Sequence, residues 1–140
     1  MPFGTARRAD APTVRSMAVM PFRSADQSAA LVADSLPEDV GSALSKAGFQ
    51  VASRASAVQM GTAADVRAAA MAQNIDAVLD GNIRVQGSSV RIYVELVDAR
   101  TGFQIWSGTF TSEMAALLSG PSVAADQIAS QLRTIAGGGR

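Results

Sequence analysis

The residues IDAVLDGNIRVQGSSVRIYVELVDARTGFQIWSGTF, numbered Ile75–Phe110, carry the clearest structural pattern in this sequence. Apolar and polar side chains alternate along them, as expected of β-strands with one buried face and one face in water. Gly87 and Ser88 can form a two-residue type II′ turn, and Asp98–Gly102 supplies a second turn. The stretch therefore predicts an antiparallel meander over residues 75–110.

Two further strands and a helix are predicted before the meander. The apolar run Val14–Phe22 fits a central strand that is covered on both faces, and Phe49–Ala52 fits a short second strand. Between them, Pro37 is expected in the first turn of a helix that ends at Gly48. Ala29–Asp34 is expected to form a preceding helical turn.

Two more helices complete the prediction. Thr62 and Asp65 resemble a capping box that opens a helix through about Gln73. Ser122 can cap a final helix. Its expected buried stripe is Ala125, Ile128, Leu132 and Ile135. The order β-α-β-α-β-β-β-α predicts an α/β (α+β) domain, with helices packed on a mixed five-stranded sheet.

The 140 residues fit one domain. Residues 1–13 show no pattern and are interpreted as a flexible tail, residues 14–136 as the domain, and residues 137–140 as a linker stub. The two ends together favour a domain cut from a longer protein.

The charge balance restricts the partners. Twelve Lys plus Arg and twelve Asp plus Glu give a formal net charge of zero, which argues against a generic nucleic-acid or anionic-membrane binder. No run approaches the roughly 18 apolar residues that a membrane-spanning helix needs, so direct membrane insertion is not expected.

Few residues are suited to catalysis. The chain has no Cys and no His, so the usual nucleophilic triads cannot be built. Lys46, the only lysine, is placed favourably at a helix C-terminus. Asp76 and Asp80 are roughly 13 Å apart along a strand, too far to share one ion. Because no phosphate-binding glycine motif is present either, the sequence predicts no enzyme, no cofactor and no metal.

Some charged and aromatic residues are candidates for binding. Trp106 fits a half-buried side chain under the last helix, or else an exposed anchor for a partner. Arg84 and Arg91 are expected on the outer face of the meander, where they either pair with charges such as Glu95 or form a recognition patch. The candidate binding residues are Arg54, Arg84, Arg91, Tyr93 and Trp106.

Three segments, taken in order, resemble a known family. They are MAVMPF at Met17–Phe22, ADSLPEDVGSAL at Ala33–Leu44, and DVRAAAMAQNIDAVLDGNIRVQGSSVRIYVELVDARTGFQIWS at Asp65–Ser107. This pattern resembles the amino-terminal domain of TolB and the TolB-like domains of bacterial regulatory and envelope proteins. Ser35 stands where a Gly is common, and Pro37 where a Thr is common. No β-propeller sequence follows, so a whole TolB protein is not expected.

The resemblance implies a noncatalytic protein-interaction or sensory domain of a bacterial envelope or signalling protein. It implies a periplasmic location, with the cytoplasm as the alternative. The implied partner is another protein or another domain of the same longer chain, and self-association stays open.

A second hypothesis is a small-ligand module that senses an anion or nucleotide and is attached to a cyclase, kinase or winged-helix regulator. It would use Arg54, Arg84 or Arg91 in a concave pocket, so dispersal of these three arginines over different faces would argue against it.

Overall fold

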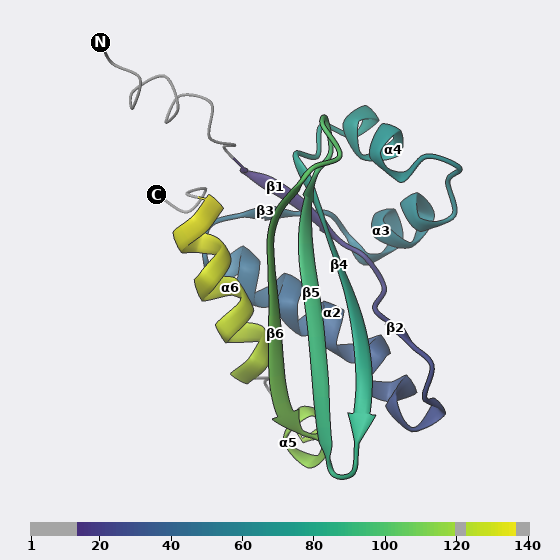
Figure 1. The fold of residues 1–140 in the computed structure, drawn as a ribbon. Helices are drawn as coiled ribbons and strands as arrows, with labels where there is room; N and C mark the ends of the chain where they lie inside the picture. The colour runs from purple at the N-terminus through teal and green to yellow at the C-terminus, as the bar shows by residue number, and fades with distance from the viewer. Residues whose placement is uncertain (1–13, 120–122, 137–140) are drawn as a thin grey trace.

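A mixed sheet forms the centre of the computed structural model, which describes residues 14–119 and 123–136 (Figure 1). In the described residues the sheet has six strands; five follow the order β3-β1-β4-β5-β6, and β2 pairs with β4. The strands are β1 Ser16–Val19, β2 Arg23–Ser24, β3 Gln50–Val51, β4 Ala77–Gln86, β5 Ser89–Asp98 and β6 Gln104–Glu113. The predicted fold class is confirmed, although the sheet contains one strand more than the five predicted, because the two-residue strand β2 also pairs with β4. The predicted tail, linker stub and Ser122 cap lie outside the described residues.

The predicted meander is confirmed. β4, β5 and β6 pair antiparallel, and Gly87 has a φ of 64° in the turn between the first two strands. This two-residue turn fixes the register, so Arg84 lies opposite Arg91 and Asn82 lies opposite Tyr93. The register between β5 and β6 shifts at Leu96.

Helices cover the sheet on both faces (Figure 1). α2 (Ala30–Lys46) and α6 (Val123–Ala136) bury their apolar stripes in one core, together with core-facing side chains of the meander. α3 (Arg54–Gly61) and α4 (Val66–Ala72) enclose a second, smaller core. Two short helices, η1 at Gln27–Ala29 and α5 at Met114–Leu118, complete the described elements.

β1 is buried on both faces, as its continuous apolar pattern predicts. Met17 and Val19 belong to the core beneath α2, whereas Ala18 and Met20 belong to the core beneath α3. Because successive strand residues point to opposite faces, α2 and α3 lie on opposite sides of this strand.

Two glycines give aromatic rings room against the sheet. A Cβ on Gly81 would lie 2.7 Å from the buried Phe22 ring, and a Cβ on Gly108 would lie 2.8 Å from Trp106. Both glycines lie opposite Val94 in the register, so they form one row across β4, β5 and β6. The Trp106 and Phe110 rings have centroids 6.3 Å apart. Glycine is required where a ring approaches the backbone this closely.

The predicted start of the first long helix is wrong. α2 begins at Ala30, so Pro37 lies inside it rather than in its first turn. A proline in a helix interior costs about 3 kcal/mol, but burying Val32 and Leu36 each contributes about 1.5–3 kcal/mol. Both of these side chains are almost fully buried. The buried stripe therefore carries the helix through the proline.

Smaller corrections concern the other helices. Thr62 is the C-cap of α3, which begins after the Ser53 cap, while Asp65 caps the separate helix α4. The two residues predicted to form one capping box therefore lie at the ends of two different helices. Ile135 is 47% exposed, so the buried stripe of α6 ends at Leu132.

Asp39 on α2 makes the stability depend on pH. Burial raises the pKa of the Asp39 carboxyl above its ordinary value of 3.8. The folded state therefore binds this proton more tightly than the unfolded state does, and the stability gained from protonation is lost as the pH rises above 3.8. We expect Asp39→Asn to raise the Tm at neutral pH and to have less effect below pH 3.8. An equal gain in Tm at both pH values would contradict this origin.

Candidate functional site

The chain segments that leave β1 and β3 run to opposite faces of the sheet. These two strands pair in parallel, and β1 leads on towards α2 whereas β3 leads directly into α3. When neighbouring parallel strands diverge in this way, a crevice opens outside their carboxyl ends, and ligands of α/β proteins bind in such crevices. The topology therefore directs attention to this edge of the sheet.

A crevice of about 250 Å³ lies at this position. Its walls come from the ends of β1 and β3, from the middle of α2 and from the start of α3. The apolar residues that line it are Val19, Pro21, Ala33, Pro37, Gly41, Val51, Ala52, Ala57 and Val58. The polar residues that line it are Asp34, Glu38 and Arg54.

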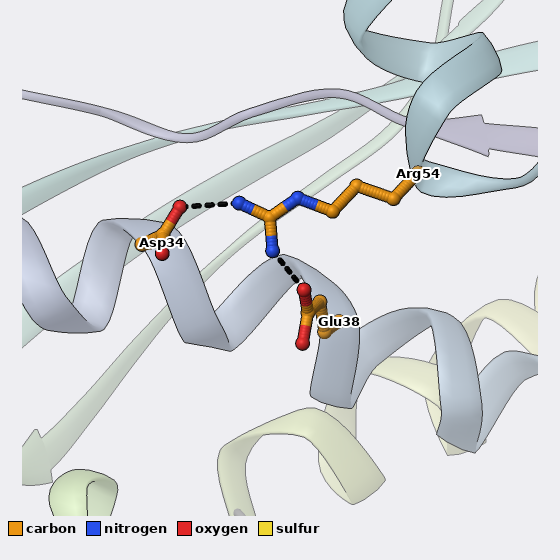
Figure 2. A network of polar contacts seen from close by, with 3 residues as sticks. All are labelled: Asp34, Glu38 and Arg54. Carbon is orange, nitrogen blue, oxygen red and sulfur yellow. Dashed lines mark hydrogen bonds and ion pairs between the residues drawn. The ribbon is translucent and has the colours of Figure 1, made fainter.

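Arg54 links the two walls of the crevice (Figure 2). It is the first residue of α3, and its guanidinium donates Nη1 to Glu38 Oε2 and Nη2 to Asp34 Oδ1. Asp34 and Glu38 are one turn apart on α2, where two carboxylates repel each other. All three side chains are more than half exposed, so the ion pairs contribute at most about 1 kcal/mol. Together the three groups leave one negative charge at the rim.

Pro37 interrupts the hydrogen-bond ladder of α2 beside the crevice. Proline has no backbone N–H, so the carbonyl of Ala33, four residues earlier, lacks its usual helical donor. Both residues line the crevice. The site thus combines an apolar floor, a break in the hydrogen bonds of one helical wall and a rim that carries a net negative charge.

The predicted binding residues are divided among three places. Arg54 lies at the crevice, whereas Arg84, Arg91 and Tyr93 line a separate hollow on the meander. Trp106 is 8% exposed and packs in the core with Phe110, so it is more deeply buried than the predicted half-buried side chain. The three arginines therefore do not converge, which argues against a single ligand pocket built from all of them.

Sequence reasoning missed the crevice itself. Its other polar members are Asp34 and Glu38, which lie 20 and 16 residues before Arg54. One sequence feature could have indicated the crevice, namely Pro37 and Gly41 four residues apart inside a helical pattern. Two weak helix formers on one helix face often mark a functional constraint.

Two aspartates at the ends of meander strands have structural roles. Asp76 Oδ2 accepts hydrogen bonds from the backbone N–H groups of Arg15 and Ser16, and ties β1 to the start of β4. Asp98 Oδ1 accepts from the N–H groups of Arg100 and Thr101 and holds the second turn. Among the described residues, no group of three or more acidic side chains is placed to bind a metal ion. No helix in that part of the chain is long and apolar enough to cross a membrane.

Comparison with solved structures shows a shared fold. Lipoprotein GNA1162 from Neisseria meningitidis superposes with a TM-score of 0.58 at 21% identity, covering 87% of this chain and 96% of the lipoprotein. TolB from Acinetobacter baumannii superposes with a TM-score of 0.57 at 16% identity, covering 89% of this chain and 29% of TolB. The predicted TolB-like fold is therefore confirmed at the level of fold.

Comparison of sequences finds a curated relative and a family model. The chain is 31% identical over 100 residues to "Putative adenylate cyclase 3" of Rhizobium meliloti (strain 1021). The match covers 69% of this chain but spans only 17% of that protein. A family model for the second domain of HilA/YgeH-like transcriptional regulators matches residues 13–128. Because that match covers most of the sequence, the chain belongs to the HilA/YgeH-like transcriptional regulator second-domain family.

Proposed function

We propose that this chain is a noncatalytic interaction and sensory domain of a bacterial regulatory protein. The observation that carries the proposal is the family match to a second domain of transcriptional regulators over residues 13–128. A related segment occurs in a protein named as an adenylate cyclase, of which it is a small part. A domain shared by proteins with such different outputs is best explained as an accessory unit rather than as the source of either output.

The crevice between β1 and β3 is the proposed contact site. Its apolar lining and size of about 250 Å³ suit one apolar side chain of a partner protein, or of another domain of the same longer chain. The Ala33 carbonyl, which receives no hydrogen bond from Pro37, can accept one from the partner. Rigid walls made of strands and helices favour such a preformed site.

A small ligand in the same crevice is the second candidate. The position at the carboxyl ends of diverging parallel strands favours it. Arg54 is already paired with Asp34 and Glu38, so this crevice fits an apolar or cationic molecule better than an anion or a nucleotide.

The compartment is a further part of the proposal. The fold shared with a lipoprotein and with TolB supports a periplasmic location. The match to a family of transcriptional regulators supports a cytoplasmic location instead. A fusion of the complete parent protein to alkaline phosphatase, which is active only outside the cytoplasm, distinguishes the two locations.

A charge swap at the rim tests the interaction. Arg54→Glu places three carboxylates at the rim, whereas adding Glu38→Arg restores an opposite charge. We expect the tagged domain to recover a partner from its source cells as the wild type and as the double variant. Recovery with Arg54→Glu alone should fall about tenfold, which corresponds to about 1.4 kcal/mol, because repulsion among the three carboxylates replaces the link between the two walls of the crevice.

Arg133→Glu, an equal charge change on α6, is the matched control and should recover the partner normally. Thermal unfolding of each variant should show losses of no more than about 1 kcal/mol, because the pairs are exposed. If Arg54→Glu recovers the same proteins in the same amounts as the wild type, the crevice is not the contact site.

A further inference from the structure

The outer face of the β4–β5 hairpin carries two pairs of like charges. Asp80 lies directly opposite Glu95, and Arg84 lies directly opposite Arg91. Like charges in this arrangement destabilise a sheet. The acidic pair is compensated, because Arg23 forms an ion pair with Asp80 at 3.0 Å.

The basic pair has no such compensation. Within residues 14–119 and 123–136, neither Arg84 nor Arg91 makes a side-chain ion pair or hydrogen bond. Asp80 and Glu95 are each four residues away along their own strands, roughly 13 Å at the backbone, which is beyond ordinary ion-pair geometry. Two adjacent positive charges on this face therefore have no ion-pair partner among the described residues.

Other hydrogen-bonding groups surround the two arginines. Arg84 and Arg91 line a shallow hollow of about 420 Å³ together with Asn82, Tyr93 and Thr109. Tyr93 is 39% exposed although it is a large aromatic residue. Most of the residues that alternate with them along β4 and β5 are fully buried in the core. The side chains that line the hollow therefore project from the opposite face of the sheet. In Figure 1 the hairpin turn lies at the far end of the sheet from α3 and α4, so neither helix covers it.

We propose that this hollow, defined by Asn82, Arg84, Arg91, Tyr93 and Thr109, binds an acidic segment of a partner protein. Each guanidinium can donate two parallel hydrogen bonds to a carboxylate, and a bound carboxylate removes the repulsion between the two arginines. Tyr93 supplies a flat apolar surface with a polar tip beside them. Arginine and tyrosine are, with tryptophan, the residue types enriched among those that dominate binding at protein interfaces.

The shape and charge favour a protein segment over other anions. Small-molecule sites are concave and enclose most of the ligand, whereas this hollow is an open sheet surface. Nucleic acid binding needs several phosphate contacts, and the chain has no net positive charge. An Asp- or Glu-rich segment needs only the two arginines.

A binding assay with a defined peptide tests the site. The probe is a labelled hexaglutamate peptide at low ionic strength, followed by fluorescence anisotropy and by backbone NMR shifts of the ¹⁵N-labelled domain. We expect the shifts to map to Asn82, Arg84, Arg91, Tyr93 and Thr109. The variant Arg84→Gln/Arg91→Gln should bind about tenfold more weakly, equivalent to about 1.4 kcal/mol. Its Tm should not fall, because the substitution removes a repulsion.

The control variant Arg15→Gln/Arg133→Gln loses the same charge from two exposed positions elsewhere, and should bind the peptide as the wild type does. Equal weakening in both double variants, or shifts that map away from the hollow, would overturn the proposal. Tighter binding of inorganic phosphate, or of an oligonucleotide of equal charge, at the same residues would also overturn it.

This inference deepens the proposed interaction role by giving the chemistry of a partner at a second surface. The peptide assay remains separable from the crevice experiment. Hexaglutamate should bind Arg54→Glu normally, whereas Arg84→Gln/Arg91→Gln should still recover the partner that inserts into the crevice. A failure at either surface is therefore distinguishable from a failure at the other.

Discussion

Gly81→Val should lower the free energy of unfolding by about 3 kcal/mol, enough to unfold a marginal domain. Gly81 is buried in β4, and even a Cβ would lie 2.7–2.9 Å from three atoms of the Phe22 ring. The ring is 5% exposed and has little space into which it can move. Valine forms strands better than glycine does, so a loss of stability would come from the ring clash rather than from strand propensity. Urea denaturation followed by circular dichroism measures the change.

Gly41→Ala is the matched control. Its Cβ would lie 3.5 Å from Val51 Cγ1, which is ordinary van der Waals contact, and alanine is favoured over glycine within a helix by up to about 1 kcal/mol. We therefore expect this variant to be at least as stable as the wild type. A midpoint for Gly81→Val equal to that of the wild type would show that the Phe22 ring does not require a glycine in β4.

Pro37→Ala should stabilise the domain by about 2–3 kcal/mol and weaken partner binding at the crevice. Alanine restores the N–H that the Ala33 carbonyl lacks and removes an interior-proline cost of about 3 kcal/mol. The more flexible unfolded chain opposes this gain by about 0.4–1 kcal/mol. The same change occupies the free acceptor and removes apolar wall from the site. Stability should therefore rise while partner recovery falls.

Ser35→Ala separates this effect from helix propensity. Ser35 is an exposed residue of α2 and does not line the crevice, so it should gain only a few tenths of a kcal/mol and leave partner recovery unchanged. If Pro37→Ala lowers the stability, the proline ring contributes packing that outweighs its cost to the helix. If it raises the stability without loss of binding, the free carbonyl is not part of the site.

The meander could be predicted because local signals determine it. Alternation separates the two faces, and the turn at Gly87 and Ser88 is enough to place Arg84 opposite Arg91. The boundaries of α2 could not be predicted in the same way. A proline is a strong local stop signal, and only burial of Val32 and Leu36 against the sheet overrides it.

The crevice could not be predicted because it arises from topology. Its walls meet only when β3 pairs beside β1 and sends α3 to the face opposite α2. The partners of Arg54 then follow from that meeting rather than from any motif. The burial of Trp106 has a similar origin, since Gly108 leaves room for its ring only once β6 is folded.

Photo-cross-linking at the crevice tests whether a partner enters it. Val58 lines the crevice and is 45% exposed, so a photoreactive residue there should sit within reach of an inserted group. Leu118, which is 50% exposed on α5 and lines no described crevice wall, is the control position.

In living source cells, we expect a protein adduct from position 58 that disappears with Arg54→Glu and returns with the added Glu38→Arg. We expect no such adduct from position 118. An adduct that forms at position 118 but not at position 58, or one at position 58 that ignores the rim charges, would contradict a partner-binding crevice between β1 and β3.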